Sequence, residues 1–113
     1  MPMSEPQRRK AANEVVFREV NERIEGLQRH FALTEQEPLQ LVCECDRLGC
    51  VEKLSVTLDA YERVRADPAC FIVASGHEDS EVEDVVDTGG RYVIVRKHAG
   101  EPRDIAESTD PRS

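Results

Sequence analysis

Large apolar side chains recur at intervals of three and four residues between positions 13 and 33, which is the spacing of one side of an α-helix. This apolar stripe consists of Phe17, Val20, Ile24, Leu27 and Phe31. The polar faces of the same segment carry Arg18, Glu19, Glu22, Arg23, Glu25 and Arg29. Acidic residues that precede basic residues by four positions add favourable pairs on the helix surface. The pattern therefore predicts an amphipathic helix over residues 13–33.

The stripe is compatible with two uses. In the first, it docks on a sheet of the same chain. In the second, it forms a seam with another copy of the chain or with a different protein, because its spacing matches the a and d positions of a heptad. It covers fewer heptads than a free coiled coil needs, so the sequence leaves both uses open.

Shorter segments after residue 38 have the patterns of strands and of one short helix. Residues 39–42 are predicted to form a short strand, and residues 51–57 alternate between apolar and polar positions, as a half-buried strand does. Residues 70–74 are all apolar, which is typical of a buried central strand. A Thr-Gly-Gly turn predicts a hairpin over residues 83–97, and a helix is expected over residues 59–66, before a proline.

The two ends of the chain lack such patterns. We predict a disordered N-terminus over residues 1–12 and a disordered tail over residues 99–113, where glycine and proline interrupt a polar sequence. Between the helix and this tail, residues 34–98 are expected to form an α+β domain with a cysteine-rich knuckle. The predicted fold class is α+β, with the long N-terminal helix packed on or beside a small, mostly antiparallel sheet that contains one short helix.

Three cysteines lie close together at Cys43, Cys45 and Cys50. Thiolates are common ligands of structural zinc. Alternate residues of an extended strand point to the same side, so Cys43 and Cys45 can present two thiols together. A turn at Gly49 lets Cys50 return towards them. The spacing therefore predicts a zinc site that clips a hairpin.

A fourth ligand must come from another part of the chain. We favour His77, because it lies in the loop directly after the apolar segment 70–74. Cys70, His30 and His98 are the alternatives. A closed set of three cysteines and one histidine would be structural, because it leaves no position for water or substrate. The same residues are also compatible with reduced thiols that bind no metal.

Composition narrows the class of protein. Aromatic residues make up 4% of the 113 residues and tryptophan is absent, so the core must be modest and aliphatic, and a metal cross-link would stabilise it. The net charge of −8 disfavours binding to nucleic acid or to an anionic membrane. Neither a signal peptide nor a run of membrane-spanning length is visible. We therefore expect a cytoplasmic protein with reduced cysteines.

The order of the motifs adds a resemblance. A Val-Cys-Glu-Cys segment at 42–45 is followed by Cys50 and by a Gly-His-Glu segment at 76–78, with further matches in 17–24 and 61–71. This order resembles a group of small bacterial proteins, largely actinobacterial and of unassigned function, over about residues 15–97. The resemblance implies a cytosolic bacterial protein whose metal set is Cys43, Cys45, Cys50 and His77. It implies no activity.

The sequence is thus best interpreted as a non-enzymatic, zinc-stabilised interaction module that contacts a second copy or a protein partner through the N-terminal helix. The alternative is a thiol-based redox or metal sensor that uses Cys43, Cys45 and Cys50. A small hydrolase comes third, because the sequence contains neither a recognisable nucleophile motif nor a glycine-rich phosphate loop.

Overall fold

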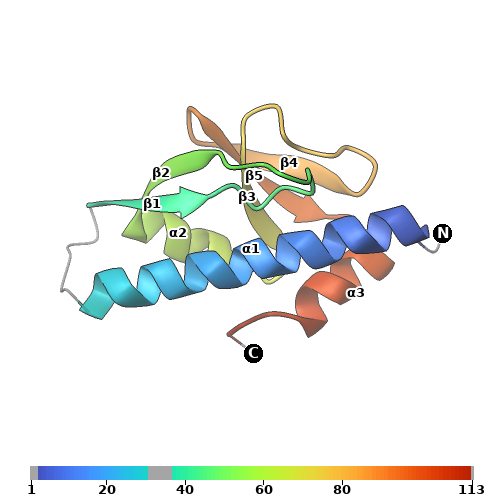
Figure 1. The fold of residues 1–113 in the computed structure, drawn as a ribbon, viewed down its shortest axis with the longest axis horizontal. Coiled ribbons are helices and arrows are strands. Elements are labelled where there is room, and N and C mark those ends of the chain that lie inside the picture. Colours follow the sequence, from blue (N-terminus) through green and yellow to red (C-terminus); the bar gives the residue numbers. More distant parts are fainter. Residues whose placement is uncertain (1–2, 31–36, 113) are drawn as a thin grey trace.

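The structure is a computed structural model that describes residues 3–30 and 37–112. In these segments, two antiparallel sheets and two short helices lie beside one long helix (Figure 1). In chain order the elements are α1 (Glu5–His30), β1 (Pro38–Val42), β2 (Lys53–Thr57), α2 (Leu58–Arg65), β3 (Cys70–Ala74), β4 (Glu83–Thr88), β5 (Tyr92–Lys97) and α3 (Glu101–Ser108). The predicted α+β class, with a long N-terminal helix and small antiparallel sheets, is confirmed.

The first sheet contains β1 and β2. Leu39 pairs with Val56 and Leu41 with Leu54, and all four side chains are buried. The residues between them face outward, which is the alternation predicted for a half-buried strand. At the end of β2, the Thr57 hydroxyl accepts a hydrogen bond from the Ala60 amide at 3.2 Å and caps α2.

The second sheet has the strand order β3-β5-β4. Every residue of β3 is buried, as predicted from its continuous apolar sequence. Strands β4 and β5 form the predicted hairpin over residues 83–97. Its turn contains Gly90 with a φ of 84°, a left-handed conformation that other residues rarely adopt.

An extended segment, residues 43–45, joins the two sheets. The Cys43 amide donates to the Glu52 carbonyl at 3.1 Å and so prolongs the β1–β2 pairing. The next amide, of Glu44, turns to the other sheet and donates to the Ile72 carbonyl of β3 at 2.8 Å. The segment therefore lies along β3 and carries the first two cysteines towards the end of that strand.

Helix α1 begins well before the predicted start at residue 13. The Ser4 hydroxyl accepts a hydrogen bond from the Gln7 amide at 3.3 Å, and Pro6 occupies the first turn, where a missing N–H costs nothing. The prediction of disorder over residues 1–12 is therefore wrong from Glu5 onward.

The side of α1 that packs on the protein is largely polar. Its buried residues are Ala11, Glu14, Arg18, Asn21 and Glu25. In the predicted apolar stripe, Val20 and Leu27 are 36% and 61% exposed, whereas Phe17 and Ile24 are half-buried. Phe31 lies outside the described residues. The possibility that the whole stripe packs on the protein's own sheet is therefore wrong, because Val20 and Leu27 are exposed.

Paired polar groups explain how a polar helix face can be buried. The Asn21 amide exchanges two hydrogen bonds with the backbone of Val42, each 2.8 Å long. Nearer the N-terminal end of α1, Glu14 contacts the last residue of β5. Lys97 Nζ lies 2.6 Å from carboxylate oxygens of both Glu14 and Glu83. Buried polar groups are tolerated when they are hydrogen-bonded and buried charges when they are paired. Helix α1 is thus held by specific polar contacts more than by an apolar stripe.

The C-terminal tail is also more ordered than predicted. Helix α3 occupies residues 101–108, within the segment expected to be disordered, and that prediction is wrong. Gly100, with a φ of 104°, allows the chain to turn into the helix, and Pro102 lies in its first turn. The Arg18 guanidinium donates to the Ala106 carbonyl at 2.8 Å and therefore fixes the last turn of α3 to α1.

Candidate metal centre

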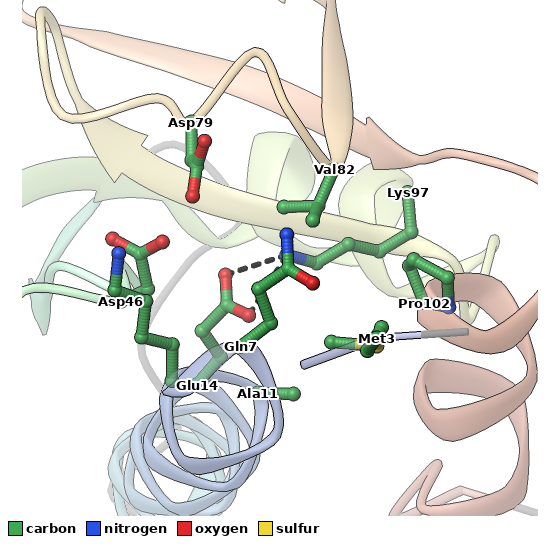
Figure 2. A pocket seen from close by; sticks show the side chains of 10 residues that line it. Met3, Gln7, Ala11, Glu14, Asp46, Asp79, Val82, Lys97 and Pro102 are labelled. Atoms are coloured by element: carbon green, nitrogen blue, oxygen red, sulfur yellow. Dashed lines mark hydrogen bonds and ion pairs between the residues drawn. The ribbon is translucent and has the colours of Figure 1, made fainter. Parts of the chain in front are cut away.

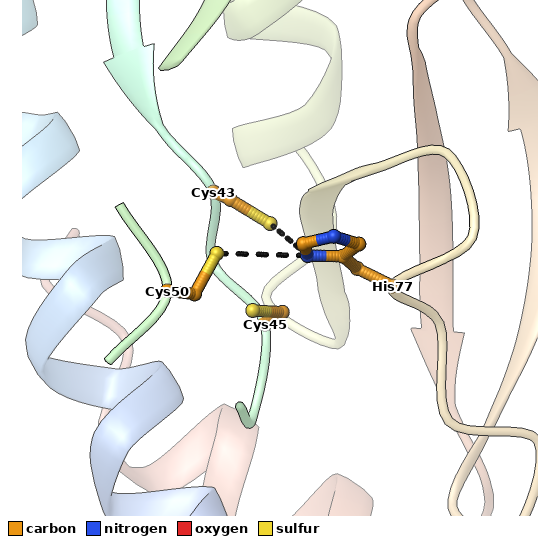
Figure 3. A group of neighbouring side chains, drawn as sticks. All are labelled: Cys43, Cys45, Cys50 and His77. Carbon is orange, nitrogen blue, oxygen red and sulfur yellow. Dashed lines mark hydrogen bonds between the residues drawn. The ribbon is translucent and has the colours of Figure 1, made fainter. Parts of the chain in front are cut away.

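Three thiols and one imidazole converge at the end of β3 (Figure 3). The ligand atoms of Cys43, Cys45, Cys50 and His77 all lie within 4.8 Å of one another. Cys43 and Cys45 are buried, whereas Cys50 and His77 are half-buried. These are the four residues that the sequence predicted as ligands, and their arrangement can hold a metal ion.

Local backbone geometry brings the three thiols to one side. Cys43 and Cys45 are alternate residues of the extended segment that follows β1, so their side chains point the same way. Gly49, with a φ of 79°, turns the chain back, and the Cys50 amide donates to the Arg47 carbonyl at 3.3 Å. This turn returns the Cys50 thiol to the other two (Figure 3).

The loop after β3 supplies the histidine. Gly76 has a φ of 89°, and the His77 amide donates to the Ala74 carbonyl at 2.9 Å, so the chain turns sharply at the strand end. The Arg47 guanidinium donates to the Gly76 carbonyl at 2.7 Å and ties this loop to the cysteine turn. The imidazole consequently faces the thiols.

Two sulfur–nitrogen distances match those expected at a tetrahedral ion. With zinc–sulfur bonds of about 2.3 Å and zinc–nitrogen bonds of about 2.0–2.1 Å, a sulfur and a nitrogen at two corners lie about 3.6 Å apart. In the structure, Nδ1 of His77 lies 3.6 Å from the Cys43 sulfur and 3.5 Å from the Cys50 sulfur. The Ala74 amide also donates to the Cys43 sulfur at 3.1 Å, which stabilises a thiolate there.

In the metal-free state the thiols affect one another strongly. A hydrogen bond from the Cys43 thiol lowers the pKa of Cys45 to about 4, whereas the same contact and burial raise the pKa of Cys43. Thiolates are the form that binds metals and the form that reacts with oxidants. The cluster therefore combines the chemistry needed for a metal site and for a redox site.

The alternative fourth ligands lie elsewhere. Cys70 begins β3, whereas His77 follows the end of that strand, and burial raises the pKa of the Cys70 thiol to about 11, which makes it unreactive. His98 lies 3.1 Å from an Asp84 carboxylate oxygen. His30 lies in the last turn of α1. None of the three belongs to the metal group found among the described residues.

A buried acidic residue beside the centre was not predicted from the sequence. Between the two strand cysteines, Glu44 points to the opposite side and is fully buried, with its carboxylate 2.9 Å from the Arg65 guanidinium. The same carboxylate accepts from the Ile72 amide at 3.0 Å and from the Asn21 side chain at 2.7 Å. The available signal was the alternation itself, because the residue between two inward-facing thiols must face the other side.

A second group of charged side chains lies beside the centre, around a small cavity between α1 and β5 (Figure 2). Burial raises the pKa of Glu14 there to about 8, and burial with a hydrogen bond to Asp79 raises the pKa of Asp46 to about 6. The free space is about 10 Å³, which accommodates about one water molecule. This group therefore holds elements together and offers no room for an organic ligand.

Comparisons with known proteins do not assign the chain to a family. No protein-family model matches the sequence, and no curated protein or solved structure matches it significantly. The resemblance to small actinobacterial proteins therefore stays a prediction. Among the described residues, no helix combines the length and the apolar character that a membrane span requires.

Proposed function

We propose that this protein is a non-enzymatic interaction module whose fold is stabilised by one zinc ion bound to Cys43, Cys45, Cys50 and His77. The observation that carries the proposal is the convergence of these four donors within 4.8 Å of one another. Three thiolates and one imidazole fill the four positions of a tetrahedral ion, so no position remains for a reacting water.

Zinc is the metal that suits this donor set. Sulfur-rich tetrahedral sites select zinc or iron–sulfur clusters, whereas magnesium and calcium require oxygen ligands. A nitrogen ligand at sulfur–nitrogen distances of 3.5 and 3.6 Å fits a single ion. The ion would connect the cysteine turn to the loop after β3, two segments joined directly by the Arg47 contact with Gly76.

The proposal is tested by measuring the metal content of protein purified without chelators. We expect about one zinc per chain in the wild type and in Cys70→Ser, because Cys70 is a buried cysteine outside the metal group. Cys43→Ser and His77→Ala should lose the zinc and unfold at lower denaturant concentration. Wild-type protein that contains no zinc and gains no stability from added zinc would overturn the proposal.

A thiol-based sensor is the second candidate, supported by the lowered pKa of Cys45 beside the Cys43 thiol. In this case the purified protein would be metal-free and fully folded. Mild oxidation by peroxide would form a disulfide among Cys43, Cys45 and Cys50, and a dithiol reductant would reverse it. Mass mapping of the oxidised protein together with its zinc content therefore distinguishes the two candidates.

A further inference from the structure

One side of α1 is exposed although it is rich in apolar residues. We call it the outer face and define it as Ala12, Val16, Glu19, Val20, Arg23 and Leu27, all of which are exposed. At about 100° per residue these positions fall within about 100° of the helix circumference. The buried residues Glu14, Arg18 and Asn21 lie on the other side of the helix.

The apolar exposure is substantial. Val16 is 55% exposed and Leu27 is 61% exposed, and Val20 lies between them at 36%. Along the helix, the face from Ala12 to Leu27 spans about 22 Å. Exposed apolar side chains gathered along one side of a helix are typical of a surface that contacts another protein.

The charges on the face indicate what covers it. The face carries one acidic residue, Glu19, and one basic residue, Arg23, four positions later. In a parallel pair of identical helices, each of these residues would meet its own copy, and like charges in contact are unfavourable. In an antiparallel pair, the sequence runs in opposite directions, so the acidic residue of one helix can meet the basic residue of the other.

The register of such a pair follows from the apolar residues. When the two-fold axis passes at the level of Asn21 and Glu22, Val16 lies level with the partner's Leu27. Val20 then lies level with the partner's Arg23, and Glu19 lies within one residue, about 1.5 Å along the axis, of that same guanidinium. One arrangement thus pairs apolar side chains and opposite charges together, and a two-fold axis repeats each contact.

We propose that the outer face of α1 binds the same face of a second copy of this chain, with the two helices antiparallel. This inference rests on the interaction module proposed above and names its partner. The paired surface is short, so the dimer belongs to the weak end of protein interfaces and forms reversibly with concentration. The metal centre stays intact in monomer and dimer.

The test measures molecular mass by sedimentation of the zinc-loaded full chain from about 1 µM to about 1 mM. We expect a monomer–dimer equilibrium in the wild type and a monomer at every concentration in Val16→Asp and Leu27→Asp. Val86→Asp is the matched control, because Val86 is 53% exposed but belongs to β4, whereas the outer face belongs to α1. A monomeric wild type, or a dimer that Val16→Asp leaves unchanged, would overturn the proposal.

Charge reversal tests the antiparallel register. Glu19→Arg and Arg23→Glu should each weaken the dimer by about tenfold or more, because each places like charges opposite one another. An equimolar mixture of the two variants should restore association, since every cross-chain pair is then of opposite charge. Single reversals that leave the dimer dissociation constant unchanged would overturn the antiparallel arrangement.

The zinc content and thermal unfolding of each variant are measured in the same samples. Variants that keep about one zinc per chain and the wild-type unfolding temperature show that any lost mass reflects the interface and not the fold. Failure of the dimer proposal would appear as a zinc-bound monomer. Failure of the proposed function would appear as absent zinc, whatever the mass.

Discussion

Glu44 and Arg65 form an ion pair of 2.9 Å in which both side chains are almost completely excluded from solvent. Glu44 lies between two of the proposed zinc ligands, and Arg65 ends α2. The guanidinium also lies over the Tyr61 ring at 5.3 Å, and it donates to the Cys70 carbonyl at 3.1 Å. The pair thus joins the cysteine segment to α2 and to the start of β3.

Removing one partner of this pair should destabilise the folded protein strongly. Glu44→Gln leaves the Arg65 charge buried without a counter-ion, which should lower the free energy of unfolding by about 3–5 kcal/mol. Urea unfolding of the zinc-bound protein measures the change. The matched control is Arg63→Ala, which breaks an exposed ion pair with Asp59 on the same helix and should cost about 0.5 kcal/mol or less. Equal losses in the two variants would contradict this prediction.

Arg18 should control the docking of α3. Its guanidinium donates to the Pro68 carbonyl at 2.7 Å, the Ala106 carbonyl at 2.8 Å and the Thr109 hydroxyl at 3.1 Å. Arg18→Met keeps an apolar stem but leaves these acceptors without a donor, at about 1–3 kcal/mol for a buried group. Hydrogen exchange should accelerate in residues 101–109 far more than in the β3–β5 pairing. Unchanged protection of α3 would show that other contacts suffice.

Glu14 should make stability depend on pH. Its pKa in the folded protein is about 8, above the ordinary value of 4.5, because burial disfavours its charge. The folded state therefore binds this proton more tightly than the unfolded state, so the contribution of Glu14 is greatest at low pH and declines between about pH 5 and pH 8.

Glu14→Gln removes that titration. The stability of the variant relative to the wild type should rise by on the order of a few kcal/mol over the same pH range. Urea unfolding at saturating zinc measures it, and Glu19→Gln, an exposed change on the same helix, should show no such trend. A difference that is constant with pH would contradict the prediction.

Removal of the metal should loosen the backbone around the centre before it unfolds the whole domain. The Ala74 amide donates to the Cys43 sulfur at 3.1 Å, and the His77 amide donates to the Ala74 carbonyl at 2.9 Å. After treatment with a chelator, hydrogen exchange should increase first at these two amides and at Glu44. Amides of the β3–β5 ladder, such as Val95, should keep their protection. Simultaneous loss of protection at all of these positions would contradict this order.

The strands were predictable because their burial follows simple patterns. The alternation in 51–57 and the apolar run in 70–74 each match one arrangement of a strand against a core. The buried face of α1 was not predictable in this way. Asn21 and Arg18 are buried because they donate hydrogen bonds to residues that lie far away in the sequence. A hydrophobic pattern cannot reveal such pairing, since it treats every polar residue as solvent-exposed.

The limits of a hydrophobic pattern also explain why the C-terminal segment was wrongly predicted to be disordered. Ala106 is the only buried residue within α3, so residues 101–108 carry almost no apolar signal. The centre itself was easier to find, because the three cysteines are close in sequence. His77 was preferred to Cys70 because it lies in the loop after the apolar strand β3, whereas Cys70 is the first residue of the strand and has the sequence pattern of a buried residue.

Segment 43–45 contributes two cysteines to the metal centre, and its middle residue, Glu44, accepts a hydrogen bond from Asn21 on α1. The same stretch of backbone therefore takes part in the metal centre and in the packing of α1. Thermodynamic reciprocity follows from this arrangement. If bound zinc strengthens the contact between Glu44 and Asn21, that contact must strengthen zinc binding by the same factor. Such coupling would link the orientation of α1, and with it the presentation of the outer face, to the occupancy of the proposed zinc site.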